Sequence, residues 1–266
     1  MLAIVGASGK LGFATLTALL DHNLLSGPQI VVTTSSSSGK QKLQPLVQNH
    51  GINLRDASYD NEDSLTAALS GCTSVLIISS PRIEKDFGPQ HPKTTGRDQD
   101  VSAVLRAAKK NSATLKSVYY TSLAFANPSK SRVMKAHEAT EKELKGMGFE
   151  NVVVMREGLY NESWPLYFGH YDVPGDERSE VPVAGDGKVC RTSIEDLGLA
   201  NALILTDPVK NWSGRTFYLS QKKAHDLKEV AWMVSKAKGK EVRLEVVGKE
   251  EHERYMLRRG RCLRVC

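Results

Sequence analysis

The sequence opens on an apolar run that leads directly into a glycine-rich turn. Leu2 to Val5 are apolar, and Gly6-Ala7-Ser8-Gly9-Lys10-Leu11-Gly12 follows, before a helical pattern begins. Glycines at this spacing fit a turn with positive φ, a backbone close to a ligand, and a helix packed tightly on a strand. The amides and dipole at the start of that helix favour a pyrophosphate. The stretch predicts a dinucleotide-binding turn; the alternative is a strand-to-helix turn that binds nothing.

Strand and helix patterns alternate after this turn. Apolar strands are expected at residues 29–34, 52–55, 74–78 and 117–121, with helical patterns between them. Such alternation predicts an α/β fold with a doubly wound parallel sheet, the Rossmann type. Ligands of these sheets bind beyond the carboxyl ends of the strands. The residues predicted to contact a dinucleotide there are Gly6, Ser8, Gly9, Lys10, Leu11, Gly12, Thr34, Ser35, Ser36, Lys40, Asp60, Ser79, Ser80, Pro81, Thr121 and His137.

The segment after the second strand indicates which dinucleotide is bound. A cofactor without a 2′-phosphate usually meets an acidic residue there, but none occurs between Asp21 and Asp56. The segment Ser35 to Lys42 offers hydroxyls and two lysines instead, and these groups suit a phosphate. We therefore predict NADP rather than NAD; the alternative is a serine-rich linker that contacts nothing.

The C-terminal part is predicted to form a smaller α+β substrate lobe. We place the division at residues 1–156 and 157–266, with the lobe interleaved with the Rossmann sheet. Aromatic residues gather between Tyr160 and Tyr171. They fit either the wall of a pocket for a flat substrate or an ordinary core. The predicted substrate pocket consists of Ser122, Leu123, Tyr160 and Trp164.

Composition limits the remaining possibilities. The chain has 266 residues, a net charge of +6 and four cysteines without C-x-x-C spacing, so we predict neither a disulfide framework nor a metal site. No stretch approaches the roughly 20 apolar residues of a membrane span, and a strand beginning at Leu2 leaves no room for a targeting peptide. We expect a cytoplasmic protein without membrane or nucleic-acid partners. The basic run from Arg258 to Arg264 fits a solvated chain end better than a nucleic-acid contact.

Several segments together resemble the NmrA-like atypical short-chain dehydrogenases/reductases. They are Gly6 to Gly12, Ser58-Tyr59-Asp60-Asn61, Tyr120-Thr121-Ser122-Leu123, His137 with Thr140-Glu141, and Arg156 to Glu162. The resemblance implies a Rossmann domain, a small C-terminal substrate lobe and bound NADP. The family holds reductases of quinones, dyes and phenolic compounds, and also cofactor-binding regulators. Within it, the chain is similar to fungal proteins of aromatic polyketide pathways of the aflatoxin type.

The sequence departs from the usual short-chain dehydrogenase pattern at the proton donor. No Tyr-x-x-x-Lys pair follows Ser122, and His137 stands at the position of the lysine. His137, Tyr160 and Ser122 are the candidate catalytic residues, with Glu141 one helical turn on to fix the histidine tautomer. The alternative is that His137 is a surface residue. We expect an NADPH-dependent oxidoreductase acting on a small aromatic polyketide; the alternatives are redox-neutral epoxide opening or dehydration, and a non-catalytic NADP-binding regulator.

Overall fold

The computed structural model describes residues 1–87, 96–125, 127–129 and 131–258. The chain divides into two compact units. Unit 1 comprises Met1–Glu157 and Ile194–Leu219, and unit 2 comprises Gly158–Ser193 and Ser220–Cys266. The sequence prediction assigns residues 194–219 to the smaller lobe, whereas in the structure they belong to unit 1.

Unit 1 is built on a seven-stranded parallel sheet with the order β10-β6-β5-β4-β1-β2-β3. The strands are β1 (Leu2–Val5), β2 (Ile30–Thr33), β3 (Asn53–Arg55), β4 (Ser74–Ile78), β5 (Ser117–Leu123), β6 (Asn151–Glu157) and β10 (Thr216–Leu219). The chain winds outward from β1 in one direction, then returns to place β4 on its other side. The predicted doubly wound sheet is therefore confirmed, and its topological switch point lies at β1.

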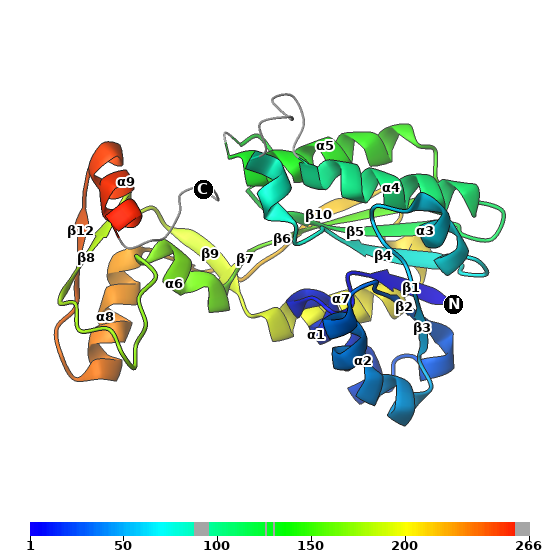
Figure 1. Cartoon of the computed structure of the whole chain (residues 1–266), viewed down its shortest axis with the longest axis horizontal. Coiled ribbons are helices and arrows are strands. Elements are labelled where there is room, and N and C mark those ends of the chain that lie inside the picture. Colours follow the sequence, from blue (N-terminus) through cyan, green and yellow to red (C-terminus); the bar gives the residue numbers. More distant parts are fainter. Residues whose placement is uncertain (88–95, 126, 130, 259–266) are drawn as a thin grey trace. The chain divides into compact units, whose positions relative to one another are not determined.

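Helices cover both faces of this sheet (Figure 1). One face carries α1 (Lys10–Asp21), α2 (Ser37–His50) and α7 (Ile194–Thr206); the other carries α3 (Glu62–Ala68), α4 (Gly96–Lys110) and α5 (Arg132–Gly146). Alternate residues of β1 serve the two cores: Leu2 and Ile4 face the first, Ala3 and Val5 the second. Strand geometry causes this alternation, and burial on both faces explains why β1 reads as a continuous apolar run.

Within the residues that the structure describes, unit 2 has two small sheets and three α-helices. The first sheet joins β11 (Ala224–His225), β9 (Val189–Thr192) and β7 (Leu159–Tyr160), and the second pairs β12 (Arg243–Val246) with β8 (Glu180–Val183). The helices are α6 (Trp164–Tyr167), α8 (Leu227–Lys238) and α9 (Lys249–Arg258). No helix within the described residues is long and apolar enough to cross a membrane.

The aromatic run of unit 2 separates into different environments. Phe168 and Tyr171 are fully buried in the core of unit 2, and Trp164 packs against that core. For Phe168 and Tyr171, the structure supports the core interpretation, whereas Trp164 is half-buried and stays a predicted pocket residue. Tyr160 lies on β7, opposite Thr192 of β9, and its role in a substrate pocket stays a prediction.

Candidate functional site

The glycine turn after β1 has the geometry that its spacing predicts. Gly6 has a φ of 93°, which disfavours any residue with a side chain, and its carbonyl accepts a hydrogen bond of 3.0 Å from the Gly9 amide. α1 begins at Lys10 with Gly9 as its N-cap. A Cβ atom on Gly12 would lie 2.3 Å from the Gly6 carbonyl oxygen. Helix α1 thus starts in close contact with the turn, and its first amides stand at the carboxyl edge of the sheet.

Three hydroxyl groups converge beside this turn, and we call Ser8, Thr34 and Ser36 the hydroxyl cradle. Ser36 is the N-cap of α2 and accepts a hydrogen bond of 3.0 Å from the Gly39 amide. The oxygens of Thr34 and Ser36 lie 3.4 Å apart. All three surround Gly39, whose absent Cβ would meet Thr34 Oγ1 at 2.4 Å, Ser36 Oγ at 2.8 Å and Ser8 Oγ at 3.2 Å. The sequence prediction did not include Gly39, because only the fold brings these segments together.

The two lysines of this segment lie on α2 and have different surroundings. Lys40 forms an ion pair with Asp56, the residue after β3. Lys42 donates a hydrogen bond of 3.0 Å to the Ser8 carbonyl oxygen, and its ammonium group lies 4.3 Å from the centre of the Phe13 ring. Lys42 therefore adjoins the hydroxyl cradle, whereas Asp56 balances the charge of Lys40, the lysine that the sequence prediction selected.

Asp60, the residue expected near an adenine, belongs to a network of charges. Its carboxylate accepts hydrogen bonds of 2.6 Å from Arg82 and 3.3 Å from Lys85. The hydrogen bond from Arg82 is the main reason that the pKa of Asp60 lies below its ordinary value. Arg82 and Lys85 also pair with Asp100, which is almost completely buried. This network joins the segments that follow β3 and β4 at the carboxyl edge of the sheet.

A buried ion pair supports the end of β4 beside residues 79–81. Arg97 donates a hydrogen bond of 2.7 Å to Asp86, and both side chains are nearly inaccessible. Its guanidinium also contacts the Ser79 hydroxyl at 3.4 Å and the Val133 carbonyl oxygen at 2.6 Å. The pair therefore fixes α4 and the start of α5 to this part of the edge. Residues 88–95, which follow in the chain, lie outside the described residues.

His137 is buried in unit 1, and the alternative of a surface position is wrong: its exposure is 5%. Its Nδ1 atom lies 2.8 Å from the Tyr120 hydroxyl. Burial, reinforced by the positive charge of Arg97, lowers the pKa of His137 to about 3. The prediction that Glu141 fixes the tautomer is also wrong, because the group in contact with His137 Nδ1 is the Tyr120 hydroxyl. His137 is consequently a neutral imidazole at physiological pH.

Ser122, another candidate proton donor, is committed to a neighbouring carboxylate. Its hydroxyl donates a hydrogen bond of 2.6 Å to Glu141, and the residue is only 1% exposed. Arg156 holds the same carboxylate through hydrogen bonds of 3.0 and 2.7 Å. Because a serine has a single hydroxyl proton, Ser122 has none left for a ligand in this arrangement. Its neighbours Thr121 and Leu123 are buried and half-buried, respectively.

A second buried carboxyl group lies on the opposite face of the sheet, at the end of β6. Glu157 is 2% exposed and accepts a hydrogen bond of 2.9 Å from the Asn201 side chain on α7. The same amide group lies 3.5 Å from Thr15 Oγ1 on α1. Burial raises the pKa of Glu157 to about 8, although the Asn201 hydrogen bond opposes this shift. This raised pKa places the ionisation of Glu157 near neutral pH.

The surroundings of His137 lead to a direct test by NMR. We expect its imidazole signals to show no titration between pH 5 and 8, because protonation would place a charge in a buried site beside Arg97. An unperturbed imidazole titrates near pH 6.5. The measurement is an ¹⁵N-correlated titration, in which a His137→Gln variant identifies the signals by their absence. A titration step near pH 6.5 would contradict the neutral assignment and restore His137 as a candidate acid.

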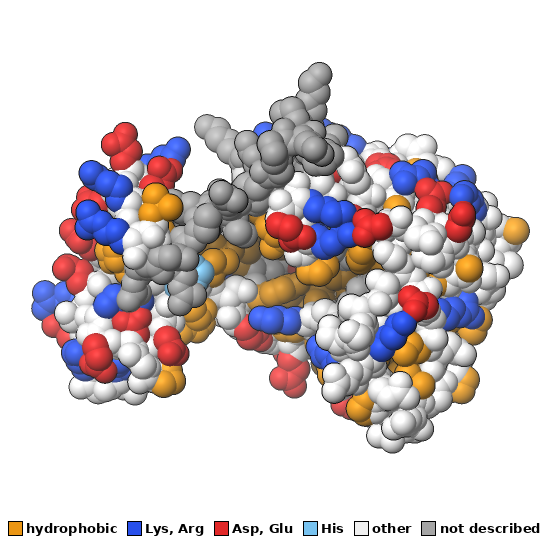
Figure 2. Space-filling view, viewed as in Figure 1, with side chains coloured by type: hydrophobic (Ala, Val, Ile, Leu, Met, Phe, Trp, Pro, Cys, Tyr) orange, Lys and Arg blue, Asp and Glu red, His pale blue; other side chains and the backbone are white. Residues whose placement is uncertain are grey.

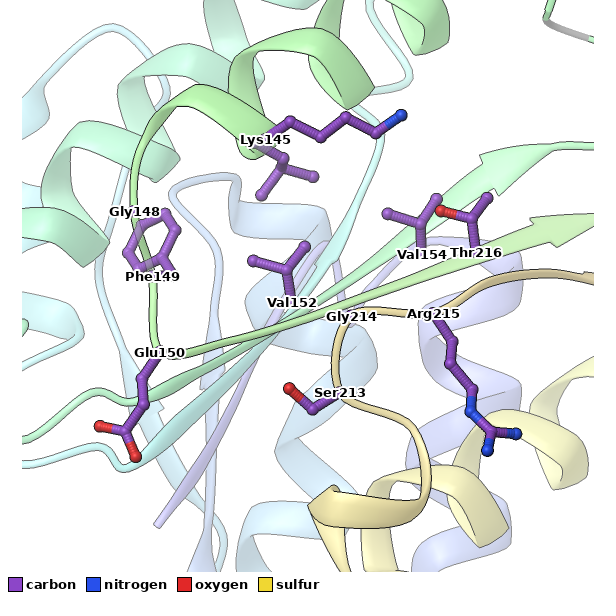
Figure 3. Close-up of a pocket in the computed structure, with 11 residues that line it drawn as sticks. Lys145, Gly148, Phe149, Glu150, Val152, Val154, Ser213, Gly214, Arg215 and Thr216 are labelled. Carbon is purple, nitrogen blue, oxygen red and sulfur yellow. The ribbon is translucent and has the colours of Figure 1, made fainter.

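Two other surface features lie apart from this edge. A pocket of about 270 Å³ lies at the amino ends of β6 and β10. It is lined by Leu144, Lys145, Gly148, Phe149, Glu150, Val152, Val154 and residues 213–216. In Figure 3 the Arg215 side chain points away from Val152 and Val154, so its positive charge does not face these two apolar side chains.

On the face shown in Figure 2, basic and acidic side chains are interspersed. The basic run beyond Arg258 lies outside the described residues.

The sheet order and the glycine turn at its switch point define a Rossmann-type dinucleotide-binding fold. Quinone oxidoreductase 2 of Escherichia coli is 30% identical to the chain, over 91% of the chain and 76% of that protein. An NmrA-like family domain-containing oxidoreductase of Aspergillus flavus is 30% identical, over 93% of the chain and 75% of that protein. No family model matches the chain.

Solved structures of reductases have the same fold. Citrobacter sp. triphenylmethane reductase, complexed with NADP(H), aligns with a TM-score of 0.80 and 25% identity, covering 98% of the chain and 84% of that protein. The NADPH complex of the Escherichia coli quinone oxidoreductase aligns with a TM-score of 0.78 and 28% identity, covering 98% and 83%. The chain belongs to the NmrA-like oxidoreductases, a family of atypical short-chain dehydrogenases/reductases. At this level, the prediction of an NAD(P)-dependent oxidoreductase is confirmed.

Proposed function

We propose that the protein is an NADPH-dependent reductase of a quinone-type aromatic acceptor. The glycine turn would bind the pyrophosphate through the first amides of α1. The hydroxyl cradle and Lys42 would bind the 2′-phosphate, since they bring hydroxyl donors and a positive charge together beside the glycine turn. The solved neighbours that hold NADP(H) support this choice of cofactor.

One observation carries the choice of acceptor: neither proton donor predicted in unit 1 is available. His137 is neutral, and Ser122 donates to Glu141. Reduction of an ordinary ketone forms an alkoxide, which is about as basic as hydroxide and requires a proton donor in the site. Hydride addition to a quinone forms instead a phenolate-like anion, whose conjugate acid has a pKa of about 10. Such an anion can take its proton from water after it leaves the site. A site in which His137 is uncharged and Ser122 is committed to Glu141 therefore favours quinones over ketones.

The roles of the remaining residues follow from this chemistry. When bound, the cofactor supplies the hydride, and the protein orients it and shields the site from water. His137, held by Tyr120 at Nδ1, would present its Nε2 atom as a neutral hydrogen-bonding group towards the cofactor. The Ser122–Glu141–Arg156 contacts would keep the ends of β5 and β6 rigid beside it. Catalysis would then depend on positioning, which is itself a large contribution to rate.

We further propose a hydroxylated anthraquinone of the aromatic polyketide class as the substrate, as in pathways of the aflatoxin type. Tyr160 and Trp164 would provide flat apolar contacts for such a molecule. This assignment rests on the aromatic residues of unit 2 and on the resemblance in sequence. It is independent of the cofactor assignment.

The test compares two aromatic acceptors of different chemistry, a quinone and a ketone. We expect 1,4-naphthoquinone to support NADPH oxidation, and acetophenone, an aryl ketone, to do so at least about 100-fold more slowly, because only the ketone needs an acid of the kind that contributes roughly 10²- to 10⁴-fold. Equal rates would reject the proposed acceptor. Tight NADPH binding without turnover of any quinone would favour the regulator, and conversion of a polyketide without NADPH consumption would favour a redox-neutral enzyme.

A further inference from the structure

Gly39 occupies a position where a side chain would disrupt the hydroxyl cradle. It lies in the first turn of α2, three residues after the N-cap Ser36, and is buried. Open space normally surrounds a residue in the first turn of a surface helix. Here the carboxyl end of β2 and the glycine turn approach so closely that a Cβ would lie within 2.4 Å of Thr34 Oγ1 and 2.8 Å of Ser36 Oγ. These distances are far below van der Waals contact, so the two hydroxyls would have to rotate away.

The orientation of the hydroxyls therefore depends on the absence of this side chain. Ser36 Oγ accepts from the Gly39 amide, which leaves its own proton free. Thr34 and Ser36 share one contact of 3.4 Å, so at most one of their two protons is used between them. At least one hydroxyl proton remains available to an acceptor. Lys42, held at the Ser8 carbonyl oxygen, adds a positive charge on the same side.

We propose that Gly39 is a specificity-determining residue that makes the site selective for a dinucleotide carrying a 2′-phosphate. This inference rests on the proposed NADPH dependence and adds the residue that enforces it. Glycine keeps the hydroxyls in place, and any larger residue turns them away from the phosphate. The pyrophosphate contacts lie in a separate segment, the glycine turn, so they are left intact. Gly39 therefore affects the affinity for NADPH, which carries the 2′-phosphate, and not the affinity for dinucleotides in general.

The experiment measures dissociation constants of NADPH and NADH by fluorescence titration for wild type and Gly39→Ala. One charge-assisted hydrogen bond corresponds to roughly 10- to 100-fold in affinity, so we expect the variant to bind NADPH at least about 10-fold more weakly. NADH affinity should change by less than about twofold, since NADH lacks the group in question. Gly146→Ala is the matched control, because it is also a helical glycine and a Cβ there meets nothing within 4 Å.

Further measurements separate this inference from the proposed function and from misfolding. Ser36→Gly removes a hydroxyl without adding bulk, and glycine is an acceptable N-cap; it should show the same selective loss of NADPH affinity. Thermal melting checks that each variant is folded. Equal weakening of NADPH and NADH, or unchanged NADPH affinity, would overturn the role of Gly39 alone. Tighter binding of NADH by the wild type would overturn the proposed cofactor and this inference together.

Discussion

Replacement of Glu157 by glutamine is expected to stabilise the folded protein at neutral pH and to have almost no effect near pH 4. The carboxyl group titrates near 4.5 when the chain is unfolded, but its pKa in the folded protein is raised to about 8 by burial. Between these values the folded state retains a proton that the unfolded state has released. Stability therefore falls as pH rises through this window, and it levels off above pH 8. Glutamine has no proton to lose and removes this dependence.

The size of this effect follows from the width of the window. Each pH unit corresponds to about 1.4 kcal/mol, so at pH 7 the variant should be more stable than wild type by about 3 kcal/mol. Asn201 provides the structural reason for a neutral side chain at this position: its Oδ1 atom is buried and has no hydrogen-bond partner in the described part of the chain. A protonated Glu157 supplies a donor beside it, and so does the amide of glutamine.

Urea unfolding at pH 4, 5.5, 7 and 8.5 measures the difference between the two proteins. Subtracting the wild-type profile from that of Glu157→Gln cancels the other titrating groups, His137 among them. Glu138→Gln is a suitable control, because that carboxylate lies in a surface i,i+4 pair with Lys142; surface pairs contribute about 1 kcal/mol or less. Parallel profiles for wild type and Glu157→Gln, or a loss of stability at pH 7, would contradict the neutral assignment.

Local sequence patterns were sufficient to predict the central sheet but not all of its members. The apolar run at β1, the glycine turn and the uninterrupted run at β4 are each complete within a few residues, and each predicts its element without reference to the rest of the chain. β10 is different, because its residue Thr216 pairs with Val154 of β6, 62 residues earlier, and only tertiary packing reveals this pairing. Residues 158–193, which follow β6 directly, belong to unit 2, so a reading in chain order places β10 there as well.

The candidate site shows the same division between local and long-range information. Helical spacing predicts that His137 and Glu141 share a face of α5, and both are buried in the structure. Spacing does not reveal that one contacts Tyr120 and the other contacts Ser122 and Arg156. Those partners come from neighbouring strands: beside Tyr120 the buried His137 is a neutral imidazole, and the Ser122 hydroxyl proton is committed to Glu141. The chemistry of the site is decided by these contacts.

Gly12→Ala is expected to weaken NADPH binding by roughly 100-fold or more and to destabilise unit 1. The new methyl would lie 2.3 Å from the Gly6 carbonyl oxygen and 2.8 Å from the Ala7 Cα. Both are backbone atoms, so no side-chain rotation can relieve the contact, and α1 must shift away from the turn. Overpacking of this kind costs about 1–3 kcal/mol. The shift also misaligns the first amides of α1, and loss of two charge-assisted hydrogen bonds corresponds to roughly 100-fold or more in affinity.

The pattern of losses distinguishes this variant from Gly39→Ala. Because the glycine turn would contact the pyrophosphate that both dinucleotides share, Gly12→Ala should weaken NADPH and NADH equally and also lower the melting temperature. Fluorescence titration with both cofactors and thermal unfolding measure the two effects, with Gly146→Ala as the control for adding a methyl group to a helix. If NADPH bound to Gly12→Ala as tightly as to wild type, the pyrophosphate could not lie against this turn. Selective loss of one cofactor would instead place the turn at the ribose, where we propose that the hydroxyl cradle binds.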